Sequence, residues 1–300
     1  MLPISYEAHL SAAWYPLRPR ALRSKLQNLQ NQAKKNSSPC KSSDIKALLV
    51  PHAGYEYSGA VATSAYQNIS PGTFKRVIIL APSHHNSFSG VALPGKQYDS
   101  FKNVVGKVAL DTVMLKALRQ NRSGLFVCRQ QAHESEHAIE VQIPLIQKYC
   151  GLCKIVPLLI GSLREQEMQV VAQALQPYLD DRTLLIATSD LTHYGTSFGY
   201  TPFTANIGRQ IVALDDRLMQ QIQKLDAAGF MKVKQETGAT VCGAQSIALL
   251  LKLLTMDKNV PTGFNTSVSC YITDYDRSSG QDENPEQSVS YVGMVFVQQK

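Results

Sequence analysis

The sequence predicts a three-layer αβα fold, in which helices cover both faces of a mostly parallel central sheet. Short and nearly continuous apolar runs alternate with segments of helical periodicity along most of the chain. This alternation is typical of parallel strands that are buried on both faces. The chain also shows no internal repeat and no linker that clearly divides two cores. Residues 1–300 are therefore expected to form a single α/β domain.

Four apolar runs are the expected central strands, at residues 47–50, 76–81, 155–160 and 183–187. The second of these runs is dense in β-branched side chains, which favour strands. Helical spacing predicts helices at residues 59–68, 136–149, 165–179, 207–225 and 244–256, the second of them interrupted or started around Pro144. Residues 89–110 have mixed turn and strand character. Two further strands, at residues 267–271 and 290–297, are expected to flank a polar loop at 277–287.

The positive charge of the chain is concentrated near its N-terminus. The net charge is +7, and residues 8–43 hold seven basic residues and no acidic one. Residues 21–35 have helical spacing, with Leu22, Leu26, Leu29 and Ala33 on one face. We therefore expect a basic helical segment at about residues 17–43, packed on the domain through its leucines. No RNA-binding aromatic motif or helix-turn-helix spacing accompanies the charge, so nucleic acid is not an expected partner.

Composition excludes several other classes of protein. A hydrophobic content of 44% with 18% charged residues is ordinary for a globular domain. No apolar run approaches the roughly 20 residues of a membrane-spanning helix, and the N-terminus lacks a signal-peptide pattern. We therefore expect a cytoplasmic protein whose six cysteines are free thiols. The close pair Cys150 and Cys153 supplies only half of a zinc site.

Histidines follow three of the four expected central strands. Four of the seven histidines in the chain lie in these loops, and ligands of open α/β sheets collect beyond the carboxyl ends of the strands. Imidazole is the commonest metal ligand in proteins, and it also titrates near neutral pH. An aspartate in one of these loops can fix the tautomer of a neighbouring histidine. The loops are Pro51-His52-Ala53-Gly54-Tyr55, Pro82-Ser83-His84-His85 and Ser189-Asp190-Leu191-Thr192-His193-Tyr194.

Cys242 comes directly before the last long helix. A thiol at a helix N-terminus feels the positive end of the helix dipole, which lowers its pKa and favours the thiolate. The alternative is that Cys242 is a small buried apolar residue. The sequence leaves both interpretations open.

Eight segments, distributed over essentially the whole chain, agree in order and spacing with one known family. They are Ala13-Trp14-Tyr15-Pro16, Pro51-His52-Ala53-Gly54-Tyr55, Tyr57-Ser58-Gly59, Pro82-Ser83-His84-His85, Glu136-His137-Ala138-Ile139-Glu140-Val141-Gln142-Ile143-Pro144, Ser189-Asp190-Leu191-Thr192-His193-Tyr194, Cys242-Gly243 and Tyr291-Val292-Gly293. Together they resemble the Memo family of archaea, bacteria and eukaryotes. The resemblance implies a fold similar to that of the LigB-like class III extradiol dioxygenases, which are non-haem iron enzymes.

The resemblance also implies a set of site residues. His52, His84 and Cys242 would be the metal ligands, with Asp190 and His193 as catalytic residues in the same pocket. Other residues expected to line that pocket are Tyr55, His85, His137 and Tyr194. The dioxygenases use a glutamate where this chain has a cysteine, so dioxygenase activity does not follow from the fold. Two imidazoles and a thiolate suit iron, copper or zinc. We expect Fe(II), with redox or oxygen chemistry on an unknown small substrate.

Two other functions remain open. Some Memo proteins are described as adaptors, so the pocket would instead bind a peptide or an aromatic ligand without catalysis. Bacterial relatives of the AmmeMemoRadiSam system imply a radical-SAM protein and an Ammecr-type protein as partners.

The remote alternative is a zinc protease. The segment His133-Glu134-Ser135-Glu136-His137 matches HExxH, in which two histidines on one helix bind zinc and the glutamate acts as base. The second charge at Glu136 and the polar segment before His133 count against this interpretation.

Overall fold

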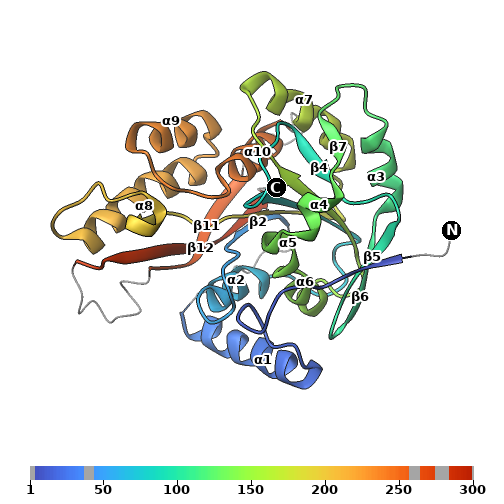
Figure 1. The fold of residues 1–300 in the computed structure, drawn as a ribbon, viewed down its shortest axis with the longest axis horizontal. Coiled ribbons are helices and arrows are strands. Elements are labelled where there is room, and N and C mark those ends of the chain that lie inside the picture. The colour runs from blue at the N-terminus through green and yellow to red at the C-terminus, as the bar shows by residue number, and fades with distance from the viewer. Residues whose placement is uncertain (1–3, 37–43, 257–263, 274–283, 299–300) are drawn as a thin grey trace.

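The computed structural model describes residues 4–36, 44–256, 264–273 and 284–298, and it has the expected layered architecture (Figure 1). The central sheet has the strand order β1-β5-β6-β8-β3-β9-β2-β12-β10. Helices α7 (Glu165–Leu175) and α10 (Ala244–Thr255) lie on one side of the sheet in Figure 1. Helices α1 (Pro19–Asn36), α2 (Gly59–Tyr66), α5 (His137–Glu140) and α6 (Ile143–Tyr149) lie on the other. The predicted fold class is confirmed.

The four predicted central strands are adjacent and parallel in the middle of the sheet. In spatial order they are β8 (Lys154–Ile160), β3 (Arg76–Pro82), β9 (Thr183–Thr188) and β2 (Ile45–Val50). Nearly all of their side chains are buried, as expected for strands with helices on both faces. The three strands that carry the histidine loops therefore end at one edge of the sheet.

Further strands extend the sheet on both sides, antiparallel next to β2 and of mixed direction next to β8. Beside β2, strand β12 (Gln287–Gln298) pairs with β2, with β11 (Phe264–Thr273) and with β10 (His193–Gly195). The remaining strands lie toward β8, and they are β1 (Ile4–Glu7), β4 (Val91–Leu93), β5 (Tyr98–Asn103), β6 (Gly106–Leu110) and β7 (Phe126–Cys128). Residues 277–283 of the expected polar loop lie outside the described residues, and β12 begins at Gln287.

Helix α1 confirms the expected amphipathic segment. Leu22, Leu26, Leu29 and Ala33 are buried, while the basic residues of the last turn are exposed. The helix packs against α2 at Gly59, where an added Cβ would lie 2.9 Å from a methyl group of Leu29. Residues 37–43 of the segment lie outside the described residues.

The helices agree in part with the sequence-based expectation. The helix predicted at 136–149 is interrupted near Pro144 as expected, since α5 ends at Glu140 and α6 begins at Ile143 with Pro144 in its first turn. Helices α3 (Thr112–Arg119), α4 (Gln130–Glu134) and α9 (Ala227–Thr237) were not predicted. Asp111 and Asp226 accept capping hydrogen bonds at the starts of α3 and α9, respectively. Helix α8 (Ile207–Gln223) follows its prediction closely. None of the described helices is both long and apolar enough to cross a membrane.

Candidate metal centre

The three histidine loops and the N-terminal end of α10 meet at the carboxyl ends of the central strands. The donor atoms of His52, His84 and Cys242 lie within 4.8 Å of one another. The three residues come from the ends of β2 and β3 and from the turn that precedes α10. The structure thus brings together the three residues that the resemblance implies as ligands.

His52 is buried, with 2% of its surface exposed, and is held on both sides of its ring. Its Nδ1 lies 2.9 Å from the Thr188 hydroxyl, and its Nε2 lies 3.1 Å from the Cys242 sulfur. Its backbone N–H donates to the Asp190 carboxylate at 2.9 Å. Burial, together with the nearby His84, lowers the pKa of His52 well below its ordinary value. The ring is therefore neutral at physiological pH, as a metal ligand must be.

His84 is oriented by a buried carboxylate. One Glu136 oxygen lies 2.8 Å from His84 Nδ1, and the other accepts the His84 backbone N–H at 2.6 Å. Burial by itself would raise the pKa of Glu136, but the hydrogen bonds from His84 outweigh it and lower the pKa to about 2. An ionised carboxylate on Nδ1 leaves Nε2 of His84 as the donor atom. Metal-binding histidines are commonly supported in this way.

Cys242 is brought to the site by a close approach of two backbones. At the next residue, Gly243, an added Cβ would lie 2.5 Å from the Thr188 carbonyl oxygen. The Gly243 N–H also donates to the Ser189 hydroxyl at 2.9 Å. Glycine is therefore the residue that lets this turn press against the end of β9.

Of the two interpretations of Cys242 that the sequence leaves open, burial favours the neutral thiol over a lowered pKa. Burial and the nearby Asp190 carboxylate raise its pKa above the ordinary value, although the Asp190 N–H donates to the sulfur at 3.3 Å. The cost of desolvating a thiolate exceeds the effect of the helix dipole here. A coordinated cation reverses that balance, because a metal-bound thiol is deprotonated.

A stack of three rings forms one wall of the site. His137 lies over His84 with ring centroids 4.4 Å apart and an interplanar angle of 25°. Trp14 lies on the other side of His137, with ring centroids 4.3 Å apart and an interplanar angle of 32°. Burial and the neighbouring histidines lower the pKa of His137 to about 3, so this ring is neutral. His137 lies where it was expected. His85 is exposed, with its ring centroid 6.3 Å from that of His137.

Glu140 anchors the segment that carries Trp14. Its buried carboxylate accepts the Tyr15 hydroxyl at 2.6 Å and the backbone N–H groups of His9 and Leu10 at 3.0 Å each. His9 Nδ1 also lies 2.9 Å from this carboxylate. Burial would raise the pKa of Glu140, but these hydrogen bonds lower it overall. The N-terminal segment is thus fixed beside the histidines through one ionised side chain.

Asp190 and His193 also reach the site. Together with Cys242, they form a second group of potential ligand atoms within 4.8 Å of one another. Burial raises the pKa of Asp190, despite the opposing effect of His193. His193 Nδ1 lies 3.0 Å from the carbonyl oxygens of Leu191 and Thr240, so it carries the ring proton and leaves Nε2 available.

The positions of Tyr55 and Tyr194 correct the expectation that both line the pocket. Tyr55 is packed in the main core, and its hydroxyl donates to the Val141 carbonyl at 2.8 Å. Tyr194 packs in a separate apolar cluster, and its hydroxyl donates to the Phe203 carbonyl at 3.0 Å. Both hydroxyls are thus used in holding backbone segments, and both rings have a packing role.

The HExxH alternative is contradicted by the geometry. Helix α4 ends at Glu134 and α5 begins at His137, so the two histidines do not share one helix face. His133 is buried, and its Nε2 lies 2.9 Å from the Ala92 carbonyl oxygen. Within the described residues, His133 belongs to no cluster of potential metal ligands. The zinc protease is therefore excluded as a reading of this motif.

Thr188 and Glu136 are the supporting residues that sequence reasoning missed. Both orient a histidine through its Nδ1 atom. In the sequence, Thr188 is only the residue after an expected strand, and Glu136 is a second charge inside the HExxH match. An acidic residue next to a histidine in an apolar segment was the available signal for Glu136.

A small cavity of about 190 Å³ adjoins Cys242. It is lined by residues of the β3 loop, the end of β8 and the start of α10, among them Ser83, Ile160 and Ser246. Pockets for drug-sized ligands measure about 300–1,000 Å³, so this space suits only a small molecule.

Comparisons with known proteins identify the family of this chain. The family model described as Memo-like protein matches residues 7–295. Protein MEMO1 of Xenopus laevis is 32% identical over 301 residues, covering 97% of each chain, and Protein MEMO1 of Homo sapiens is 31% identical over 295 residues, covering 95% of each. A crystal structure of an uncharacterized protein from Escherichia coli K12 is 13% identical, with a TM-score of 0.47, and covers 84% of this chain and 99% of its own. By its sequence, over nearly its whole length, this chain belongs to the Memo-like protein family.

Proposed function

We propose that this protein binds one transition metal ion through His52 Nε2, His84 Nε2 and Cys242 Sγ, with Fe(II) as the native ion and copper or zinc as alternatives. The observation that carries the proposal is the convergence of these three donors within 4.8 Å. Each histidine is oriented through its Nδ1 by a separate buried partner. This second layer of contacts is what a metal site requires, and a chance cluster does not need it.

The proposed chemistry is a redox or oxygen reaction on a small substrate. Once bound, such an ion supplies Lewis-acid and redox chemistry at the site. Asp190 is suited to hold a proton more readily than an ordinary aspartate does, because burial raises its pKa. His193 is suited to accept or donate a proton at Nε2, since its Nδ1 faces two carbonyl oxygens. The wall of Trp14 and His137 would limit the access of water to these groups.

A non-catalytic adaptor is the second candidate. The observation that favours it is the Trp14 and His137 stack, which offers a flat apolar surface to a peptide or an aromatic ring. Whether the protein is an enzyme or an adaptor, the proposed partners are a radical-SAM protein and an Ammecr-type protein. Metal content separates the candidates, because a pure binding module has no need of a bound ion.

The decisive experiment is anaerobic purification followed by elemental analysis, with a spectrum recorded after adding Fe(II) and nitric oxide. We expect one metal ion per chain and a ferrous nitrosyl spectrum that the Cys242→Ser variant lacks or shifts. Cys128→Ser is the matched control, since Cys128 is exposed and lies on β7, outside the site. Sub-stoichiometric binding of every transition metal after loading would contradict the proposal and favour the adaptor.

A further inference from the structure

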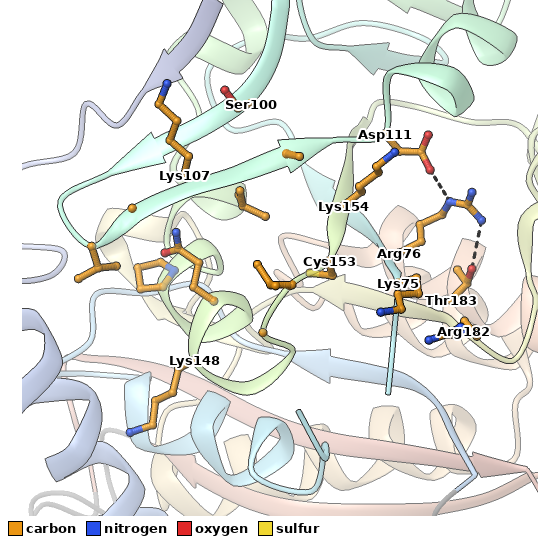
Figure 2. Close-up of a pocket in the computed structure, with 18 of the residues that line it drawn as sticks. Lys75, Arg76, Ser100, Lys107, Asp111, Lys148, Cys153, Lys154, Arg182 and Thr183 are labelled. Atoms are coloured by element: carbon orange, nitrogen blue, oxygen red, sulfur yellow. Dashed lines mark hydrogen bonds and ion pairs between the residues drawn. The ribbon is translucent and has the colours of Figure 1, made fainter. Parts of the chain in front are cut away.

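A much larger cavity lies at the opposite end of the central strands. It measures about 1,380 Å³ and contains the first residues of β3, β8 and β9, namely Arg76, Lys154 and Thr183. The strands run from this cavity to the histidine loops. Seven residues of strand span about 20 Å, so the two places are well separated. Figure 2 shows this cavity, with strand starts on one side and Lys107 and Lys148 on the other.

The lining of the cavity is strongly basic. Seven basic and three acidic side chains line it, which gives an excess of four positive charges. The basic residues are Arg23, Lys75, Arg76, Lys107, Lys148, Lys154 and Arg182. They come from segments far apart in the sequence, so the fold itself gathers them. A concave surface of one charge focuses the electrostatic potential more strongly than a flat surface does.

Most of this charge is not neutralised by the protein. Arg76 pairs with Asp111 at 2.8 Å and with Asp180 at 4.0 Å, so two of the three acidic residues form ion pairs with the same arginine. Lys148 donates to the Leu26 carbonyl at 3.3 Å. Lys154 interacts electrostatically with Asp111. The other four basic residues make no ion pair or side-chain hydrogen bond within the described part of the chain, and they are Arg23, Lys75, Lys107 and Arg182.

Three of the basic residues are placed next to one another by backbone hydrogen bonds. The Lys154 N–H donates to the Lys75 carbonyl at 2.9 Å, and the Lys75 N–H donates to the Arg182 carbonyl at 2.7 Å. Like charges held side by side on neighbouring strands repel one another, and a bound anion relieves that repulsion. The strand starts therefore bring the cations Lys75 and Arg182 together at one end of the cavity, and Figure 2 shows Lys154 extended toward Asp111 beside them.

We propose that this cavity binds a small molecule that carries two or more phosphate groups. Lysine and arginine are the side chains that proteins use for phosphate, and several phosphates are needed to match the excess charge. Leu26, Val105, Pro144 and Leu152 supply apolar surface for a compact organic body. Nucleic acid fits less well, because the described lining residues include no aromatic side chain for base stacking.

Calorimetric titration of the full chain with inorganic tripolyphosphate and with fructose 1,6-bisphosphate tests the proposal. We expect saturable binding of one tripolyphosphate per chain, with orthophosphate at least about tenfold weaker, since fewer charge-assisted hydrogen bonds form. The Lys75→Gln/Arg182→Gln double variant should weaken binding by about tenfold or more. The matched control, Arg122→Gln/Lys224→Gln, removes the same charge at exposed positions outside the cavity lining and should change binding by less than about twofold.

Three results would overturn the proposal. One is the absence of saturable tripolyphosphate binding at millimolar concentration. Another is an equal loss of binding in the two double variants, which would show an effect of net charge alone. The third is tighter binding of a mixed-sequence RNA oligonucleotide than of tripolyphosphate, abolished by the cavity variant, which would assign the surface to nucleic acid. Circular dichroism and metal content of both double variants establish that each is folded.

Discussion

The two ends of the central sheet are built from the same strands and differ in almost every physical respect. At the carboxyl ends, three donor side chains converge, and the rings of His52 and His84 are held by the buried partners Thr188 and Glu136, respectively. At the amino ends, exposed lysine and arginine side chains surround a cavity of about 1,380 Å³ with few partners of their own. The first arrangement is rigid and suits a metal ion. The second is open and suits a small molecule that carries several phosphate groups.

This difference also explains why the larger of these two cavities is not the candidate metal centre. A metal site needs donors that converge at bonding distance, so its residues fill the space between them. The cavity beside Cys242 measures only about 190 Å³. Cavity volume alone favours the basic cavity as a functional site. The metal-ligating side chains and the hydrogen bonds that orient them identify the carboxyl ends of the strands as the candidate metal centre.

The largest expected effect is at Cys242. Replacing it with serine removes a soft, anionic donor, and we expect metal affinity to fall at least tenfold, or about 1.4 kcal/mol. Cys242→Glu should retain iron, because it restores a carboxylate of the type found in the 2-His-1-carboxylate face. Competition titrations with a chromophoric chelator measure both. Metal binding by the serine variant as tight as that of the parent would transfer the third position to Asp190 or His193.

Glu136 tests the supporting contacts. Glu136→Gln keeps the size of the side chain but removes the charge that orients His84, so we expect metal affinity to fall by about tenfold. The same chelator competition measures this change. The matched control is Glu134→Gln, because Glu134 is a neighbouring acid that accepts a hydrogen bond from Tyr98 and contacts no proposed ligand. Equal affinities of the Glu136 and Glu134 variants would show that this carboxylate has only a structural role.

Glu140 is expected to affect stability first and the metal second. Glu140→Gln leaves buried donors of the N-terminal segment poorly satisfied, at a cost of about 1–3 kcal/mol in the free energy of unfolding. The folded pKa of Glu140 lies below its ordinary 4.5, so its contribution is present above pH 4.5 and is lost as the pH falls through the folded value. Urea unfolding at pH 7 and at acid pH measures both. A gap between parent and variant that stays constant down to low pH would contradict this account.

His133→Ala should have the smallest effect on the metal. The residue bonds to the Ala92 carbonyl and lies outside the ligand clusters, so metal affinity should change by less than about twofold while some stability is lost. Elemental analysis of the purified variant measures this. Loss of the metal on removing His133 would revive the zinc-protease interpretation.

The two ends of the sheet should also behave independently. Substitutions more than about 10 Å apart without shared partners are usually additive. Lys75→Gln/Arg182→Gln should therefore leave iron affinity within about twofold, and Cys242→Ser should leave tripolyphosphate binding equally unaffected. If each set of substitutions changed the affinity for the other ligand, iron or tripolyphosphate, the two ends of the sheet would be coupled.

Sequence reasoning found the parts of the site that follow strands. The loops of His52, His84 and Asp190 were recognisable because each comes directly after an apolar run. Trp14, Glu136 and Glu140 were visible only as members of a family pattern, since their contacts join segments more than 50 residues apart. The tyrosines Tyr55 and Tyr194 show the opposite error, because proximity in sequence to a ligand does not decide which way a ring faces.

The basic cavity was not foreseen for a related reason. Charge patterns in the sequence reveal local runs, such as the basic residues of α1, and among those basic residues only Arg23 lines the cavity. The other cations are single residues near strand starts, on β6 and on α6, where each resembles an ordinary solvated side chain. Only the register of β3, β8 and β9 places them together.

X-ray absorption of the iron-loaded protein tests the central claim most directly, because it counts the ligands around the ion. The account predicts one sulfur and two imidazole nitrogens from the chain, with the sulfur absent in Cys242→Ser and retained in Cys128→Ser. An iron environment of nitrogen and oxygen ligands alone in the parent protein would contradict it.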